Sequence, residues 1–234
     1  MNINMKAILL AAGRGTRLKP LTIEKPKCLI NIGKKTIIER QILLLKKIGI
    51  KDILVITGYQ SKMIEDQLGN QVRYKHYKDY NKTNNLNTLW SARNELTGEI
   101  ICLFTDLLFE YLLLEKIVYS EGDICLAVNT KKILEGTMRV RIKDSKIVGV
   151  GSHIPVSEGS GNFLGIAKFS TSGTSMLLEQ MKKMVTGHQN DYYTIAIDTL
   201  AKMKKNIDYV DVSNFAWREV DTKEDLILAQ KEFG

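Results

Sequence analysis

The feature that most constrains this chain is a short apolar stretch that breaks into a basic loop with two glycines. Residues 6–12 (Lys-Ala-Ile-Leu-Leu-Ala-Ala) predict a buried strand, and residues 13–17 (Gly-Arg-Gly-Thr-Arg) follow it directly. Glycines let backbone N–H groups approach an anion closely, and arginines supply the countercharge. The loop therefore predicts a site that grips a nucleoside triphosphate. Taken alone, it would equally fit a tight turn with solvated basic side chains.

Phosphate chemistry suggests roles for two basic residues in and near this loop. The planar guanidinium of Arg17 matches phosphate oxygens, so we expect it to hold a leaving pyrophosphate. The ammonium of Lys27 is a compact point charge and suits the charge that develops at the α-phosphate. The expected nucleotide-binding residues of the loop are Leu10, Ala11, Ala12, Gly13, Arg14, Gly15 and Thr16.

The composition is that of an ordinary globular protein with a basic surface. The chain has 234 residues, 44% of them hydrophobic, which is enough for one large α/β domain with a sizeable core. Its formal net charge of +8 fits an anionic partner, although a lysine-rich surface would explain the charge equally well. The basic residues are dispersed rather than gathered with aromatic residues on one stretch, so we expect no nucleic-acid partner.

The cysteines and the apolar runs bear on the cellular setting. Cys28, Cys102 and Cys125 are far apart, which argues against a disulfide framework and against a zinc site. No cleavable signal pattern opens the chain and no apolar run approaches the length of a membrane span. These features predict a cytoplasmic protein without a membrane partner.

Strand and helix patterns alternate along the first half of the chain and then give way to a hairpin. We expect strands at 6–12, 52–57, 72–76, 100–104, 123–128, 163–169 and 207–212, and helices at 36–48, 61–68, 89–96, 112–119, 175–185, 193–204 and from Thr222 onward. Alternation of this kind is typical of a parallel sheet with right-handed crossovers. Residues 138–142 and 147–150 alternate around a turn and predict an antiparallel hairpin.

The predicted fold class is therefore α/β. We expect a single Rossmann-like domain over residues 1–234, with a mixed, mainly parallel sheet flanked by helices and a small antiparallel hairpin insertion. Residues 1–110 would form a nucleotide-binding half, and residues 111–234 an acceptor-binding half.

Asp106 follows the predicted strand 100–104. Ligands in a doubly wound sheet bind outside the carboxyl ends of the strands, and Mg²⁺ prefers one or two carboxylates together with substrate phosphates. Asp106 is therefore a candidate magnesium ligand. The alternative is an aspartate that caps the next turn.

The asparagine-rich loop 80–88 precedes a predicted helix. Amide side chains supply both donors and acceptors, which suits recognition of a pyrimidine edge. Asn85 and Thr88 are the candidates for contact with the nucleotide. The alternative is a helix-capping turn, in which Thr88 would serve as the cap.

The run Leu10-Ala-Ala-Gly-Arg-Gly-Thr-Arg-Leu-Lys-Pro-Leu-Thr22, with Lys25-Pro-Lys-Cys-Leu29, resembles the N-terminal signature of nucleotidyltransferases that activate sugar phosphates and related phosphoryl compounds. It differs from a Walker P-loop because no Gly-Lys-Ser/Thr follows the glycines. The resemblance implies that Asp106 and Asp221 bracket one Mg²⁺ ion, since Asp221 lies in a Trp-x-x-x-Asp-Thr setting similar to the family's second metal-binding aspartate. It also implies a fold in which homodimers are common.

Two departures separate the chain from the glucose-phosphate enzymes. Thr105 stands where that group usually has glycine, and residues 84–93 lack its Gln-x-x-x-Gly pattern. Both stretches look more like those of cytidylyltransferases that act on phosphocholine or phosphonates. The resemblance thus predicts an enzyme that transfers CMP from CTP to a small phosphorylated alcohol, phosphorylated amine or phosphonate and releases pyrophosphate.

Two alternative functions stay open at this point. One is a sugar-1-phosphate nucleotidyltransferase that uses UTP, dTTP or GTP. The other is a non-catalytic nucleotide-sensing module, which would be expected to have lost Lys27 or the aspartates, whereas this chain has all of them.

The acceptor side gives weaker signals. Arg139 on the predicted hairpin, Lys168 on the strand 163–169, and Asn162 and Glu158 in the preceding loop are candidate acceptor ligands. For each of them a solvated surface position is the competing interpretation.

Overall fold

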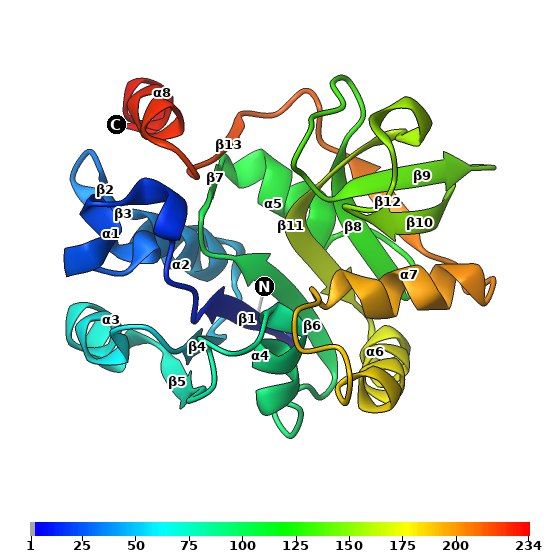
Figure 1. Ribbon diagram of the computed structural model, residues 1–234, viewed down its shortest axis with the longest axis horizontal. Coiled ribbons are helices and arrows are strands. Elements are labelled where there is room, and N and C mark those ends of the chain that lie inside the picture. Colours follow the sequence, from blue (N-terminus) through cyan, green and yellow to red (C-terminus); the bar gives the residue numbers. More distant parts are fainter. Residues whose placement is uncertain (1–2) are drawn as a thin grey trace.

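The computed structural model describes residues 3–234, and in it β-strands form one mixed sheet with helices on both faces (Figure 1). The order along the sheet is β10-β9-β11-β6-β1-β4-β5, and β8 and β12 extend it from β11. The sheet strands are β1 (Met5–Ala11), β4 (Asp52–Thr57), β5 (Arg73–His76), β6 (Glu99–Phe104), β8 (Ile124–Asn129), β9 (Arg139–Lys143), β10 (Lys146–Gly151), β11 (Gly161–Phe169) and β12 (Asp208–Asp211).

The remaining elements are α-helices, two small sheets and the short 3-10 helices Thr16–Leu18, Lys27–Leu29, Gly69–Gln71 and Val156–Glu158. The α-helices are α1 (Leu21–Glu24), α2 (Ile37–Ile48), α3 (Ser61–Leu68), α4 (Asn85–Ser91), α5 (Tyr111–Val118), α6 (Thr171–Met184), α7 (Thr194–Lys202) and α8 (Lys223–Phe233). One small sheet pairs β2 (Asn31–Ile32) with β3 (Lys35–Thr36), and the other pairs β7 (Leu107–Phe109) with β13 (Trp217–Glu219). Among residues 3–234, no helix combines the length and the apolar character needed to cross a bilayer.

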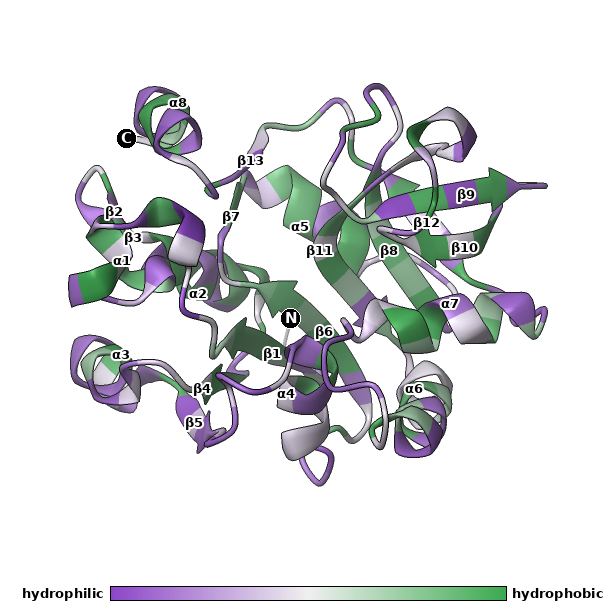
Figure 2. Cartoon of the chain, viewed as in Figure 1, coloured by the Kyte–Doolittle hydropathy of each residue, from purple (hydrophilic) through white to green (hydrophobic). Residues whose placement is uncertain are grey.

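Strand β1 is central because its residues are apolar on both faces. It pairs in parallel with β4 and β6, so that Leu9 lies between Val55 and Leu103. Ala7 and Leu9 face one core with Ile42 of α2, whereas Ile8 faces the other core with helices α4, α6 and α7. Figure 2 shows these hydrophobic strands between helices of mixed hydropathy. A strand buried on both faces is what a continuous apolar run predicts.

The second half of the sheet is mainly antiparallel, although β12 pairs in parallel with β8. β11 pairs antiparallel with β6, β8 and β9, and β9 and β10 form a hairpin. The predicted α/β class, the mixed sheet and the antiparallel hairpin are therefore confirmed.

Most predicted elements agree with the structure to within a few residues, and helix α4 is the clearest difference. Sequence periodicity placed this helix at 89–96, but it begins at Asn85 and ends at Ser91. Asn84 caps it by accepting a hydrogen bond from the Asn85 N–H at 2.8 Å. The capping asparagine, rather than the first apolar residue, determines where the helix begins.

The short β7–β13 sheet has no counterpart in the sequence predictions. It pairs Leu107 with Glu219, and the N–H of Val220 donates to the carbonyl of Asp106 at 2.9 Å. Because of this pairing, the residues just after β6 and just after β13 lie side by side. The two predicted metal-binding aspartates, Asp106 and Asp221, are located there.

Candidate active site

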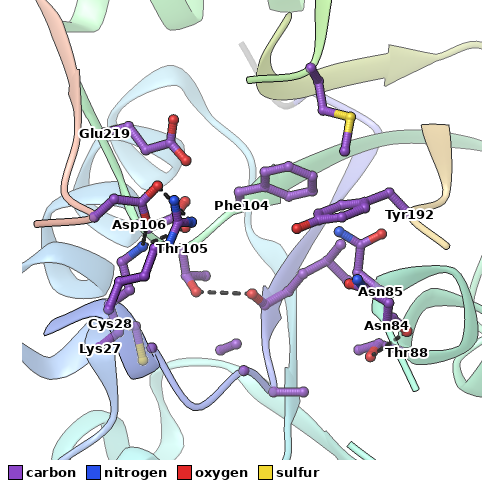
Figure 3. Close-up of a pocket in the computed structure, with 18 of the residues that line it drawn as sticks. Lys27, Cys28, Asn84, Asn85, Thr88, Phe104, Thr105, Asp106, Tyr192 and Glu219 are labelled. Atoms are coloured by element: carbon purple, nitrogen blue, oxygen red, sulfur yellow. Dashed lines mark hydrogen bonds and ion pairs between the residues drawn. The ribbon is translucent and has the colours of Figure 1, made fainter. Parts of the chain in front are cut away.

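A cavity of about 420 Å³ opens at the carboxyl ends of β1 and β6 (Figure 3). This edge of a parallel sheet is where α/β folds bind ligands. The cavity brings together most of the predicted site residues from distant parts of the chain. They are Leu10, Ala11, Ala12, Gly13, Gly15, Thr16, Arg17, Lys27, Asn85, Thr88, Asp106 and Asp221.

Lys27 lies at the centre of a charged cluster in this cavity. Its ammonium lies 2.8 Å from Asp106 Oδ2 and also forms an ion pair with Asp221. Arg17 Nη2 lies 2.7 Å from the other oxygen of Asp221. Burial alone would lower the pKa of Lys27, but the charges of Asp106 and Asp221 outweigh it and the pKa is raised. The cluster therefore keeps a positive charge in place above neutral pH.

The backbone around Gly15 makes room for Lys27. Gly15 has a φ of +59°, and a Cβ at this position would lie 2.8 Å from Lys27 Cβ. The hydroxyl of Thr22 donates to the Gly15 carbonyl at 2.8 Å and fixes the turn. A side chain at position 15 would therefore strain the backbone and push Lys27 out of place.

Glu219 adds a third carboxylate that the sequence predictions did not assign to the site. One oxygen each of Asp106, Glu219 and Asp221 lies within 4.8 Å of the others. Burial, followed by repulsion from Asp106 and Asp221, raises the pKa of Glu219 to about 8. Such a set of hard oxygen donors fits Mg²⁺, which takes carboxylates and completes its shell with phosphates and water. The sequence signal that could have identified Glu219 as a site residue is its position on β13, two residues before Asp221.

The asparagine loop borders the opposite end of the cavity from the carboxylates (Figure 3). Asn85 Oδ1 accepts a hydrogen bond from the Tyr193 N–H at 2.7 Å, and the Asn84 N–H donates to the carbonyl of Gln189. Loop 188–193 thus holds this end of the cavity in place. Because Oδ1 of Asn85 already accepts this hydrogen bond, the Nδ2 hydrogens of Asn85 are the group that can donate to a ligand.

Aromatic side chains line the wall between these two ends. The ring of Phe104 lies 6.1 Å from that of Phe163 and 6.4 Å from that of Tyr192, measured between centroids. Met138 lines the same wall. This part of the cavity offers apolar and π surface beside the carboxylates, a setting that suits the organic part of a small ligand.

Five of the sequence candidates are not among the residues that line the cavity. The guanidinium of Arg14 lies 5.7 Å from the centroid of the Tyr59 ring. Lys168 is buried and donates to the carbonyl of Ser120. Glu158 is exposed and lies 3.5 Å from Arg141. The expected ligand contacts of these residues have no support in the structure.

Arg139 and Asn162 are buried and hold loops. The Arg139 guanidinium donates to the carbonyls of Leu134, Ser152 and Ile154. Asn162 Oδ1 accepts hydrogen bonds from the Leu134 N–H and the Thr137 hydroxyl, each at 3.0 Å. Both residues were predicted to contact the acceptor directly. In the structure their side chains form hydrogen bonds with loops 131–137 and 152–160. Their residue types alone do not reveal these contacts.

The sequence of this chain is similar to that of a known protein family. The family model described as "Nucleotidyl transferase" matches residues 6–119. This match spans slightly less than half of the chain, at its N-terminal end. This match covers β1, the glycine loop, Lys27 and Asp106, so the resemblance inferred from the sequence is confirmed there.

Individual relatives extend the similarity beyond residue 119. The CTP:phosphoglutamine cytidylyltransferase of Campylobacter jejuni is 26% identical over 95% of this chain and 98% of its own length. The choline-phosphate cytidylyltransferase of Streptococcus pneumoniae is 39% identical over 45% of this chain and 47% of its own length. The solved structure of CTP:phosphocholine cytidylyltransferase from Streptococcus pneumoniae is 23% identical, with a TM-score of 0.81 over 99% of this chain and 100% of that chain. The structural similarity confirms the fold.

Proposed function

We propose that this protein transfers CMP from CTP to a small acceptor that carries a phosphoryl or phosphonyl oxygen, with release of pyrophosphate. The observation that supports this most strongly is the position of Lys27, whose ammonium pairs with Asp106 and Asp221 in a cavity bordered by the glycine loop. The relatives with cytidylyltransferase names support the choice of donor.

The transfer needs no covalent intermediate with the protein. An acceptor oxyanion is already a nucleophile near neutral pH and attacks the α-phosphorus, while the bond from that phosphorus to the pyrophosphate oxygen breaks. The work of the chain is to position the reactants and to neutralise charge. Lys27 would stabilise the charge at the α-phosphate. The side chain of Arg17 is 64% exposed, which leaves it room to turn from Asp221 to the departing pyrophosphate.

The three carboxylates would hold a magnesium ion. Asp106 and Asp221 are the proposed ligands, and Glu219 is close enough to join them or to bind a water of the shell. The ion would neutralise charge on the phosphates as it does in other phosphoryl-transfer enzymes. Lys27 would then be released from the carboxylates and become available to the triphosphate.

The asparagine loop supports a pyrimidine donor. The amide hydrogens of Asn85 can donate to the O2 and N3 acceptors of cytosine, and Thr88 lines the cavity beside it. We propose cytosine over uracil because N3 of uracil carries a hydrogen and cannot accept from the same donor.

A donor panel tests the proposal. The purified protein is incubated with Mg²⁺ and a mixture of phosphocholine, phosphoethanolamine, 2-aminoethylphosphonate, inositol phosphate and sugar 1-phosphates. CTP, UTP, dTTP, GTP or ATP is added one at a time, and pyrophosphate is measured. We expect release with CTP at a rate at least tenfold above the other donors. Faster release with UTP, dTTP or GTP and a sugar phosphate would replace the proposal with the sugar-nucleotide alternative.

A further inference from the structure

Gln41 of helix α2 reaches the turn that bears Asp106. Its side chain is buried, with 1% of its surface exposed, among apolar residues of α2 and the sheet. The Nε2 group donates to the carbonyl of Phe104 at 2.9 Å and to the carbonyl of Leu107 at 2.7 Å. One amide group therefore holds the backbone on both sides of Thr105 and Asp106.

Two further contacts fix the same turn from other directions. The Thr105 hydroxyl donates to the carbonyl of Leu10 at 2.9 Å, and the Val220 N–H donates to the carbonyl of Asp106 at 2.9 Å. These contacts tie the turn to β1 and to the residue before Asp221. Gln41 adds the connection to α2, and it contacts the two carbonyls where the chain leaves β6 and enters β7.

The oxygen of the same amide group shows that packing alone does not explain a glutamine at this position. Its Oε1 atom is buried and has no hydrogen-bond partner among the described residues. A buried amide oxygen without a partner is unfavourable, and an apolar side chain of the same length would avoid that cost. The two hydrogen bonds from Nε2 are the contribution that an apolar residue could not make.

We propose that Gln41 is a positioning residue that sets the orientation of the Asp106 carboxylate for the metal. This inference rests on the proposed function, because it assigns Gln41 a role in the magnesium site of that reaction. Outer residues that orient metal ligands commonly change metal affinity by 10–100-fold when they are replaced. Loss of the two donors would let the Phe104–Leu107 turn relax, and Asp106 would then share the ion with Asp221 less well.

The test compares metal binding in two matched variants. Gln41→Met removes the donors and keeps the length of the side chain. Gln180→Met makes the same exchange at a buried glutamine of α6, outside the cavity. Mn²⁺ is titrated into each full-length protein with CTP present and no acceptor. Water-proton relaxation enhancement then distinguishes Mn²⁺ held by the protein from Mn²⁺ on free CTP.

We expect the dissociation constant of protein-held Mn²⁺ to rise roughly tenfold or more in Gln41→Met and to stay within twofold in Gln180→Met. Thermal melting reports folding separately. If Gln41→Met does not fold, Gln41→Glu preserves the shape with at most one donor and should weaken Mn²⁺ in the same direction.

Each outcome decides the inference. Wild-type affinity in a folded Gln41→Met or Gln41→Glu would overturn the role of Gln41 and leave the proposed function intact. A wild-type protein with no protein-held Mn²⁺ would overturn the metal site and the role of Gln41 together. Pyrophosphate release in the donor panel reports on the proposed function independently of both results.

Discussion

The ammonium of Lys27 lies 2.8 Å from the carboxylate of Asp106, although 79 residues separate the two in sequence. The same ammonium pairs with Asp221, which is 194 residues from Lys27 in sequence. A lysine therefore lies between the two carboxylates that are proposed to share a metal ion. A divalent cation and Lys27 would compete for those oxygens until a triphosphate offers Lys27 another partner.

Replacement of Lys27 should abolish most of the turnover. Lys27→Ala removes the positive charge proposed for the α-phosphate, and a single contact of this kind is worth about 3 kcal/mol, or roughly two orders of magnitude in kcat. Pyrophosphate release at saturating CTP measures the loss. Lys19→Ala, an exposed lysine outside the cavity, is the control with the same change in net charge. Turnover of Lys27→Ala near the wild-type rate would remove Lys27 from the mechanism.

Metal binding should depend on the nucleotide. Without CTP, Lys27 neutralises Asp106 and Asp221, so Mn²⁺ should bind weakly, and CTP should tighten it. Lys27→Met removes the competing cation and should increase Mn²⁺ affinity in the absence of CTP by several-fold. Electron paramagnetic resonance of free Mn²⁺ measures both effects. Equal affinity in wild type and Lys27→Met without CTP would show that the lysine does not occupy the metal position.

The two glycines of the basic loop should respond differently to alanine. Gly15→Ala places a Cβ 2.8 Å from Lys27 Cβ at a φ of +59°, whereas a Cβ on Gly13 meets nothing within 4 Å. Gly15→Ala should lower the free energy of unfolding by about 1–3 kcal/mol, and Gly13→Ala should change it little. Urea unfolding of the two variants side by side gives the comparison. Equal stability of both would contradict the close approach at Gly15.

The sequence allowed prediction of those parts of the site that depend on local pattern. A continuous apolar run predicts β1, and the loop with Gly15 follows that run directly in the sequence. Asp106 likewise follows the apolar run that predicts β6. The pairing of β7 with β13 was missed, because each strand has three residues and its partner is more than a hundred residues away. Short strands of this kind have no periodic signal of their own.

The acceptor candidates have surroundings that the sequence did not predict, for a different reason. Arginine, lysine and asparagine are usually exposed, so Arg139, Lys168 and Asn162 were expected to face a ligand or solvent. The fold buries all three and pairs them with backbone groups of loops and turns. Gln41 is the opposite case, a residue near the site that the sequence did not single out. A glutamine on an apolar helix face gives no sign in the sequence that its side chain holds the turn of Asp106.

Arg139 should therefore act through stability. Arg139→Met leaves the carbonyls of Leu134, Ser152 and Ile154 without their charged donor, which should cost about 2–4 kcal/mol in the free energy of unfolding. Arg141→Met, at an exposed position of the same strand, should cost less than about 0.5 kcal/mol. Urea unfolding measures both. A stable Arg139→Met variant with a raised KM for the acceptor alone would restore the direct-contact hypothesis.

The N-terminus of α2 should make stability depend on pH. Burial tends to raise the pKa of Glu39, but hydrogen bonds from the backbone and hydroxyl of Thr36 outweigh it and lower the pKa below its ordinary 4.5. A lowered folded-state pKa stabilises the protein above pH 4.5, and this contribution disappears as the pH falls through the folded-state value. Glu39→Gln should therefore be less stable than wild type at pH 7, and the gap should close in acid. A gap of constant size down to pH 3 would contradict this capping interaction.

The mass of the reaction product distinguishes transfer of CMP from simple hydrolysis of CTP. The protein is incubated with CTP, Mg²⁺ and the mixture of phosphorylated and phosphonylated acceptors, and the products are separated by mass. We expect a new compound whose mass equals one acceptor plus CMP less water, formed in step with pyrophosphate and absent with Asp106→Asn. Consumption of CTP to free CMP with no linked product, or an undiminished product with Asp106→Asn, would contradict this expectation.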